Sequence, residues 1–262
     1  MREARVVLAD WKAGLAGYPF WWRFGLLDIR LRYRRTLLGP FWVTLSFGVS
    51  AVALTFVYSM LFKVAAESYF AYLIVGLAVW GLLSTLLIDG CTTFVRHSQL
   101  IQQQPLPILA HALRSVVGNF LVFSHNLVVV VIALAVAGVG FSWPTLLAIP
   151  ALAVVLLNGV WFAMLLGMLC ARFRDLPQLV AVLVHVAFLV TPVFWYKDML
   201  TGRARFVDLN PLYAFLELVR APLLGQLPPL RSVQVVLVAT IGGWLLTFLV
   251  ARRLQPKLAY WV

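Results

Sequence analysis

Charged residues are scarce in this chain of 262 residues, where they make up 11% of the total and only nine are acidic. A soluble domain carries about 25% charged residues, whereas 63% of this chain is hydrophobic. No polar segment is long enough to form a separate soluble domain. The composition therefore predicts an integral membrane protein.

The chain also lacks a nucleotide-binding motif. A P-loop requires Gly-Lys-Ser/Thr, because the lysine reaches the nucleotide phosphates. The four lysines follow Trp, Phe, Tyr and Pro, and none follows glycine. Any ATP hydrolysis must therefore come from another subunit, and we expect this chain to bind no cofactor itself.

Groups suited to catalysis or metal binding are equally sparse. The acidic residues stand singly, and the two cysteines, Cys91 and Cys170, show no metal spacing, so we expect no metal site. An enzyme that processes a lipid-linked glycan remains the alternative, with an isolated acid such as Asp198 or Asp208 in the active site. Apart from Asp89 at the end of the second run, the apolar runs hold only His125 and His185 among acidic, basic and histidine residues, which disfavours an ion-coupled carrier.

Six apolar runs have the length of about 20 residues that crosses a bilayer, and they predict an all-α membrane protein with six transmembrane helices. The runs cover residues 40–62, 69–89, 115–138, 144–170, 177–196 and 232–251. Pro40 opens the first run, where the first turn of a helix tolerates proline.

The basic residues fit this topology better than they fit a surface for nucleic acid, although the net charge is +12. With the N-terminus inside, fifteen of the 21 Lys and Arg residues fall in cytoplasmic segments and six fall outside. This bias predicts a multi-pass protein with both termini in the cytoplasm. The first 37 residues hold eight basic residues and no uninterrupted apolar core, so we expect no cleavable signal peptide.

Residues 1–37 are expected to form a cytoplasmic N-terminal segment, followed by a membrane domain over 38–262. An amphipathic helix is predicted from Tyr18 onward, either lying on anionic lipid or wedged between the membrane and a partner subunit. Four arginines before the first span should anchor it in the headgroup region: Arg30, Arg32, Arg34 and Arg35.

Helical phase suggests a substrate path along the first and fifth runs. At 100° per residue, one face of the first run carries hydroxyl and aromatic side chains, which suit a sugar chain, whereas the opposite face is aliphatic. Helix packing in the membrane is the other explanation of such a stripe. The candidate path residues are Thr44, Phe47, Thr55, Tyr58 and Phe62, with His185, Phe188 and Trp195 on one face of the fifth run.

Two connections between the apolar runs have features that suggest a short helix. The first inner loop holds Leu100 and Ile101 before two prolines, and it is expected to form a short helix for a partner or a simple solvated turn. Between runs five and six, residues 211–220 are apolar but too short to span. They are expected to be re-entrant or to form a cap.

Six short motifs, in their order along the chain, resemble those of permease subunits of ABC-2 type polysaccharide exporters. The nearest branch is the O-antigen exporters of lipopolysaccharide assembly, with capsule and teichoic-acid exporters as relatives. The motifs are Arg32–Arg35 with Leu38-Gly39-Pro40 and Trp42, Leu100-Ile101 before proline, Ala171–Asp175, Thr191–Trp195, Asn210–Leu212 and Glu217–Arg220.

The resemblance implies a homodimeric permease in the inner membrane, docked to two copies of a separate ATPase that binds ATP and Mg²⁺. It implies export of a glycan carried on a polyprenyl-diphosphate lipid. Leu100–Pro107 would be the coupling helix, and Gln102–Gln104 stand where the family often has a basic residue, so docking should depend on shape and hydrogen bonds. The candidate coupling residues are Arg96, Leu100, Ile101, Arg172, Arg174 and Asp175.

Overall fold

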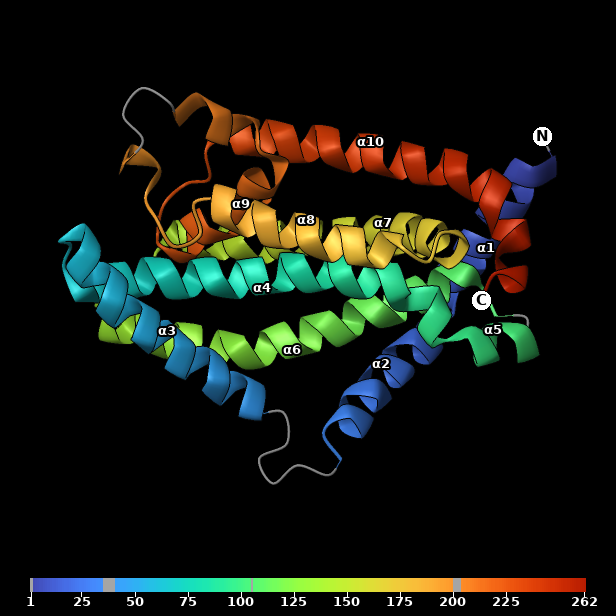
Figure 1. Cartoon of the computed structure of the whole chain (residues 1–262), viewed down its shortest axis with the longest axis horizontal. Coiled ribbons are helices and arrows are strands. Elements are labelled where there is room, and N and C mark those ends of the chain that lie inside the picture. The colour runs from blue at the N-terminus through green and yellow to red at the C-terminus, as the bar shows by residue number, and fades with distance from the viewer. Residues whose placement is uncertain (1, 35–40, 105, 200–203) are drawn as a thin grey trace.

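Figure 1 shows the computed structural model of the chain, which describes residues 2–34, 41–104, 106–199 and 204–262. Within these ranges the chain forms helices and connecting turns and contains no strand. The all-α prediction is thereby confirmed. Arg35, Pro40 and Pro105, which the sequence placed at an anchor, a helix start and a loop, lie outside the described residues.

The helices vary widely in length, and short 3-10 turns (η) join or end several of them. In chain order they are α1 Arg2–Ala16, α2 Tyr18–Arg32, α3 Phe41–Phe62, α4 Ala66–Arg96, α5 Ser98–Gln103, α6 Ile108–Val136, η1 Trp143–Leu147, α7 Ala148–Arg172, α8 Leu176–Val190, η2 Lys197–Met199, η3 Ala204–Leu209, α9 Pro211–Leu223, α10 Leu230–Leu254 and η4 Gln255–Tyr260.

Five helical stretches within the described ranges are long and apolar enough to cross a membrane, and each contains most of one predicted run. Hydropathy alone locates them, because about 20 apolar residues are needed to span the hydrocarbon. They are Phe41–Phe62, Ala66–Arg96, Ile108–Val136, Trp143–Arg172 and Leu230–Tyr260.

The predicted run over residues 177–196 is not one continuous helix. α8 ends at Val190, and its 15 residues reach about 22 Å, less than the 30 Å or so of a hydrocarbon core. Thr191 has extended backbone with ψ 135°. The residue before a proline is disfavoured in the α region, so Pro192 accounts for the break.

Six helices run along the long axis of the molecule, α3 obliquely, and successive ones run in opposite directions (Figure 1). They are α3, α4, α6, α7, α8 and α10. Both chain ends lie at the end of the molecule where α5 is found, and α3 and α4 meet at the other end. α8 lies in the same direction along this axis as α3 and α6, although it is shorter than the others.

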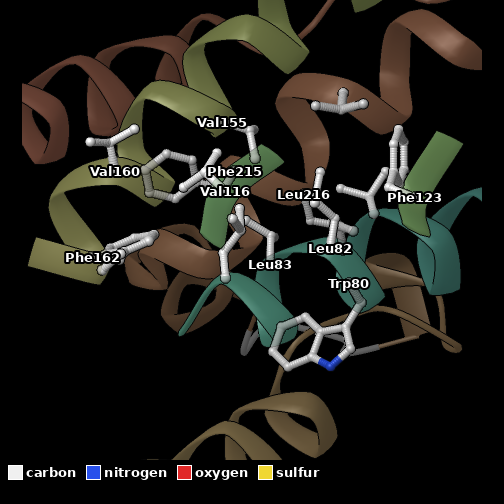
Figure 2. Close-up of a cluster of buried hydrophobic side chains, with 14 of the residues drawn as sticks. Trp80, Leu82, Leu83, Val116, Phe123, Val155, Val160, Phe162, Phe215 and Leu216 are labelled. Carbon is white, nitrogen blue, oxygen red and sulfur yellow. The ribbon is translucent and has the colours of Figure 1, made fainter. Parts of the chain in front are cut away.

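The core is organised around α4, which packs against α3, α6, α7, α8 and α9. Figure 2 shows Trp80, Leu82 and Leu83 of α4 surrounded by apolar side chains from the neighbouring helices. These neighbours are Val116 and Phe123 of α6, Val155, Val160 and Phe162 of α7, and Phe215 and Leu216 of α9. A helix that is enclosed by others is apolar all round, and from Ala71 to Leu87 α4 has no exposed residue and no charged one.

The N-terminal helices pack onto the membrane helices. α2 approaches α6 at Gly25, where an added Cβ would lie 2.7 Å from Cγ1 of Val117. Trp11 of α1 packs edge-on against Trp244 of α10, with ring centroids 5.4 Å apart. The sequence predicted helix only from Tyr18, so α1 was missed, while Arg30, Arg32 and Arg34 of the predicted anchor are exposed.

Two glycines of α4 offer a matched test of the packing. A Cβ at Gly76 would lie 2.7 Å from the carbonyl oxygen of Val193, whereas nothing lies within 4 Å of a Cβ at Gly81. Overpacking costs roughly 1–3 kcal/mol. Gly76→Ala should therefore lower the melting temperature of the purified protein by several degrees, and Gly81→Ala should leave it unchanged or raise it. Equal melting temperatures for the two variants would contradict the close approach.

Candidate functional site

Residues 191–196, which follow α8, form a non-helical segment that tyrosines of α4 hold in place. The hydroxyl of Tyr72 lies 3.2 Å from the carbonyl oxygen of Pro192 and 3.0 Å from that of Trp195. The hydroxyl of Tyr69 donates to the carbonyl of Phe194. A carbonyl outside a helix needs another donor when water is scarce, so these side chains make the irregular backbone tolerable.

Arg220 of α9 contacts the same segment and is the largest fully buried side chain, at 1% exposure. Its Nη1 donates to the carbonyl oxygen of Pro192 at 2.7 Å, and its Nε donates to Oε1 of Glu217 at 3.1 Å. Its guanidinium carbon lies 4.2 Å from the centre of the Tyr72 ring. A buried charge is stable only with such partners, so α9 and the 191–196 segment stabilise each other.

Asn210 joins the start of α9 to the end of α8. Its Oδ1 accepts from the backbone N–H groups of Leu212 at 2.9 Å and Tyr213 at 3.4 Å, which is an N-cap. Its Nδ2 donates to Oγ1 of Thr191 at 2.8 Å. Three of the motifs noted in the sequence thus meet in one place. We call this unit the α8–α9 framework: Tyr69, Tyr72, the 191–196 segment, Asn210, Glu217 and Arg220.

The α8–α9 framework supports an aromatic cluster that includes three of the predicted path residues. The ring of Tyr58 stacks on Phe62 with centroids 5.5 Å apart, and it lies 5.3 Å from the ring of Phe194. Phe194 in turn lies 5.4 Å from Phe188 of α8. The aromatic cluster is therefore Tyr58, Phe62, Phe188 and Phe194, and Phe194 is the member that links α3 to α8.

The other predicted path residues on α3 are placed differently. Thr55 is buried, and its hydroxyl donates to the carbonyl of Ala51 in its own helix at 2.8 Å. Ala51 and Ser59 are buried on the same side of α3, so Thr55 lies in a packing seam of this helix. Thr44 and Phe47 are half-buried. The stripe thus divides into a packing part and the aromatic pair Tyr58 and Phe62.

The predicted path residues on α8 and just after it also differ in their surroundings. Phe188 enters the aromatic cluster and contacts Trp80 of α4, with ring centroids 5.7 Å apart. His185 is exposed on the surface of α8. Trp195 is half-buried, and its Nε1 donates to the carbonyl of Leu189 at 3.3 Å.

Apolar faces of α3 and α8 are left uncovered on either side of the aromatic cluster. On α3 they include Val49, Phe56 and Met60, which are 61%, 64% and 64% exposed. A groove of about 910 Å³ runs along this face of α3 and reaches Val129 of α6. The uncovered residues of α8 are Leu179, Val182, Leu183, Val186, Leu189 and Val190. Apolar surface of this extent is covered by lipid or by protein in a membrane.

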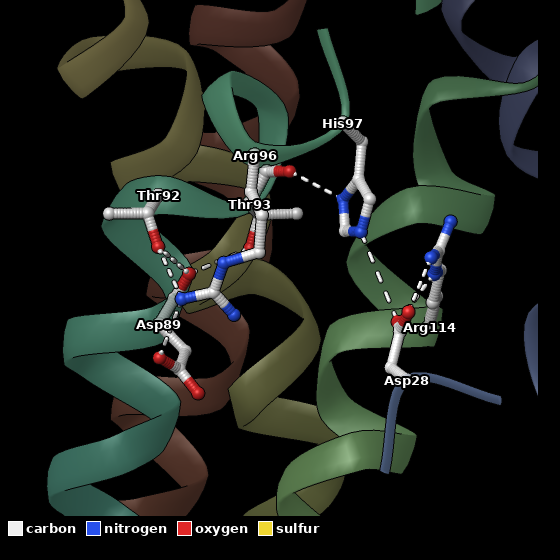
Figure 3. Close-up of polar contacts among 7 residues, drawn as sticks. All are labelled: Asp28, Asp89, Thr92, Thr93, Arg96, His97 and Arg114. Atoms are coloured by element: carbon white, nitrogen blue, oxygen red, sulfur yellow. Dashed lines mark hydrogen bonds and ion pairs between the residues drawn. The ribbon is translucent and has the colours of Figure 1, made fainter. Parts of the chain in front are cut away.

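At the other end of α4, a polar group ties α2 to α6 (Figure 3). The carboxylate of Asp28 accepts two hydrogen bonds of 2.6 Å from Arg114, whose side chain is 10% exposed. His97 bonds to the carbonyl of Thr93 at 2.7 Å and lies 4.0 Å from Asp28. Burial, followed by the charge of Arg114, lowers the pKa of His97, so the imidazole is neutral at pH 7.

Carboxylates of both N-terminal helices flank the short helix α5. His97, near Asp28 of α2, precedes α5, while Asp10 of α1 accepts hydrogen bonds from the N–H groups of Ile108 at 2.9 Å and Leu109 at 3.3 Å. Burial raises the pKa of Asp10, and these two bonds partly offset that effect. Asp10 of α1 therefore caps the start of α6, where the segment that carries α5 ends, while Asp28 of α2 lies near the start of that segment.

The predicted coupling residues differ in accessibility. Leu100 and Ile101 of α5 are half-buried, and Ile101 packs against the core. Four others are exposed on the end of the molecule that carries the chain termini: Arg96, Arg172, Arg174 and Asp175. Gln103 and Gln104 are exposed too, and Gln102 donates to the carbonyl of Val262 at 2.5 Å.

The sequence analysis noted several residues of these sites only as motifs and did not predict how they come together. Asp28 and Arg114 are separated by 86 positions, and no local pattern pairs them. Arg220 had a usable signal, because an arginine in an apolar segment with Glu217 three residues earlier suits a helical ion pair. Within the described ranges, no group of three or more His, Cys, Asp or Glu side chains is arranged to hold a metal ion.

Two Asp–Arg pairs in Figure 3 allow a controlled test of the link between α2 and α6. Asp28→Asn should cost roughly 2–3 kcal/mol, because it leaves Arg114 largely buried beside an uncharged partner. Asp89→Asn should cost less than about 1 kcal/mol, because its partner Arg96 is 48% exposed. Thermal melting of the two purified variants measures the difference. A smaller loss for Asp28→Asn than for Asp89→Asn would contradict the assignment.

Comparison with known proteins places these features in a family. The family model described as "ABC-2 type transporter" matches residues 25–224, from α2 to the end of α9. An O-antigen export system permease protein RfbA of Klebsiella pneumoniae is 26% identical over 189 residues, which cover 71% of this chain and 72% of that protein. A second protein of that name and organism is 25% identical over the same shares. The chain belongs to the ABC-2 type transporter family and is a transporter subunit rather than an enzyme.

Proposed function

We propose that this chain is the permease subunit of an ATP-driven exporter that moves a lipid-linked polysaccharide of the O-antigen type across the inner membrane. The aromatic cluster carries the proposal, because Tyr58, Phe62, Phe188 and Phe194 join two helices whose neighbouring faces are uncovered. The apolar faces of aromatic rings pack against the C–H faces of sugars. Such contacts do not require the sugar to carry a charge. The names of the two relatives support the same substrate class.

The proposed topology has six crossings with both termini in the cytoplasm. α8 and the 191–196 segment together form the fifth crossing, and α9 is a re-entrant helix of 13 residues. Irregular backbone is tolerated at membrane depth where it is enclosed by protein, and Thr191, Pro192 and Val193 are buried. The basic residues concentrated near the chain termini support the orientation, as does the position of both ends on one side in Figure 1.

A homodimer would cover the apolar faces of α3 and α8. In a two-fold arrangement each subunit contributes the same surface, so α3 and α8 of two copies can surround one path. The aromatic cluster then lies beside the path near the non-cytoplasmic end, while Thr55 and Ser59 pack within each subunit. The glycan on its polyprenyl-diphosphate carrier would pass between the two copies. Membrane lipid would cover the remaining apolar surface.

Two copies of an ABC ATPase would dock at the end of the bundle that carries α5. The ATPase binds ATP and Mg²⁺, and this chain binds neither. Gln103 and Gln104 present uncharged polar groups there, with Arg172, Arg174 and Asp175 exposed on the same end. Because Ile101 packs against the core of its own chain, it would position α5 rather than form the whole contact. A movement of α5 would also displace α1 and α2, because Asp10 bonds to the residues after α5 and Asp28 lies near His97 before it.

Export in living cells tests this proposal with two substitutions, one in the aromatic cluster and one away from α3 and α8. Tyr58→Ala removes a ring from the aromatic cluster, and aromatic contacts contribute about 0.5–1.5 kcal/mol each. We expect surface polysaccharide to fall about fivefold to tenfold. Val238→Ala, at a position 71% exposed on α10 and outside the proposed faces of α3 and α8, should leave export near normal. The measurement is the amount of polymer on the cell surface, with accumulation of polymer inside.

Co-purification shows whether a loss of export arises at the path. The Tyr58→Ala variant should retain its self-association and its ATPase partner, and Tyr58→Phe should retain export. If Tyr58→Ala exports normally, the aromatic cluster does not contact the polymer. If it loses self-association instead, this part of α3 is a packing seam.

A further inference from the structure

A basic pocket lies between the C-terminal ends of α7 and α10 and the start of α1, away from the aromatic cluster. Its volume is about 480 Å³. The lining residues lie on the parts of α1, α7 and α10 at the end of the molecule that carries both chain termini (Figure 1), where headgroups of a bilayer would surround the helices. Its lining includes Glu3, Arg172, Leu249, Arg252, Arg253 and Leu254.

The charges in this pocket are not balanced. Arg172, Arg252 and Arg253 contribute three guanidinium groups, and Glu3 contributes one carboxylate. Two helix C-termini add about half a negative charge each, which still leaves a positive surplus. None of the three arginines forms an ion pair with any described residue. Nε of Arg252 is buried and, among the described residues, without a hydrogen-bond partner. These groups are therefore available to an anion.

Apolar surface continues from the pocket along α10. Leu249 lines the pocket, and Leu245 and Leu246 lie one turn before it on the same face. These leucines are 48%, 58% and 50% exposed, respectively. A ligand with a charged head and an apolar chain would satisfy both parts of this surface, with the head at the arginines and the chain along the leucines.

We propose that this pocket binds the phosphate headgroup of an anionic membrane phospholipid, with an acyl chain along Leu245, Leu246 and Leu249. Guanidinium groups bind phosphate oxygens in pairs, and basic pockets between transmembrane helices bind anionic lipid headgroups. Arg172 belongs both to this pocket and to the surface proposed for the ATPase. A contact with the ATPase explains Arg252 and Arg253 less well, because the adjoining leucines of α10 would face hydrocarbon rather than a soluble partner. The site is separate from the proposed polymer path between α3 and α8.

Titration of the purified permease–ATPase complex in detergent tests the site. Dioleoylphosphatidylglycerol is added, with dioleoylphosphatidylcholine as the uncharged control, and binding is measured by native mass spectrometry. Each arginine near a headgroup contributes about 1 kcal/mol. The double variant Arg252→Gln/Arg253→Gln should therefore bind phosphatidylglycerol about thirtyfold more weakly. Lys257→Gln removes one charge at the same end outside the pocket, and it should bind as the unmodified complex does.

A variant that binds the lipid more tightly cannot be explained by loss of folding. Glu3→Gln removes the carboxylate of the pocket, so it should tighten phosphatidylglycerol binding severalfold while phosphatidylcholine binding stays unchanged. The proposal fails if the double variant or Glu3→Gln binds phosphatidylglycerol as the unmodified complex does. It also fails if inorganic phosphate or farnesyl diphosphate displaces phosphatidylglycerol at an equal concentration, because a soluble anion or an isoprenoid carrier would then be the occupant. Loss of the ATPase from the double variant with unchanged lipid binding would assign the arginines to protein docking.

Discussion

The buried guanidinium of Arg220 is the interaction on which the α8–α9 framework depends. It donates to the carbonyl of Pro192, pairs with Glu217 and lies over the ring of Tyr72. α8 ends at Val190, and the irregular backbone that follows it in apolar surroundings needs donors for its carbonyls. Arg220 and the tyrosines of α4 supply them. The break in α8 is thus a structured turn that sets Phe194 between Tyr58 and Phe188.

At the opposite end of the molecule, carboxylates of α1 and α2 contact residues that are far away in the sequence. Asp28 and Asp10 bring the two N-terminal helices to the two ends of the α5 segment. α4 begins near Tyr69 and Tyr72, which contact the 191–196 segment, and ends beside His97. This single helix therefore connects the aromatic cluster to α5. A rigid helix packed on all sides can transmit a displacement between two such places, provided both have two arrangements.

The sequence predicted the long helices well because hydropathy depends on local composition. The first run, 40–62, contains the whole of α3, Phe41–Phe62. The prediction of one continuous helix over 177–196 was wrong beyond Val190. Apolar composition continues past this residue, although the Thr-Pro pair indicated a helix end. α1 was missed because its apolar residues form no long run. The aromatic pair of α3 was selected by helical phase, but phase cannot tell a packing face from an open one, so Thr55 was grouped with Tyr58.

Transport by purified protein tests the role of the aromatic cluster most directly. The permease and its ATPase are reconstituted in proteoliposomes with a lipid-linked polysaccharide, and the polymer that reaches the far side is measured with and without ATP. Phe194→Leu keeps an apolar side chain but removes the ring that joins α3 to α8. We expect ATP-dependent transfer by the unmodified complex and about tenfold less by Phe194→Leu, with equal ATPase binding. Transfer at an equal rate by both, or transfer that needs no ATP, would contradict the account.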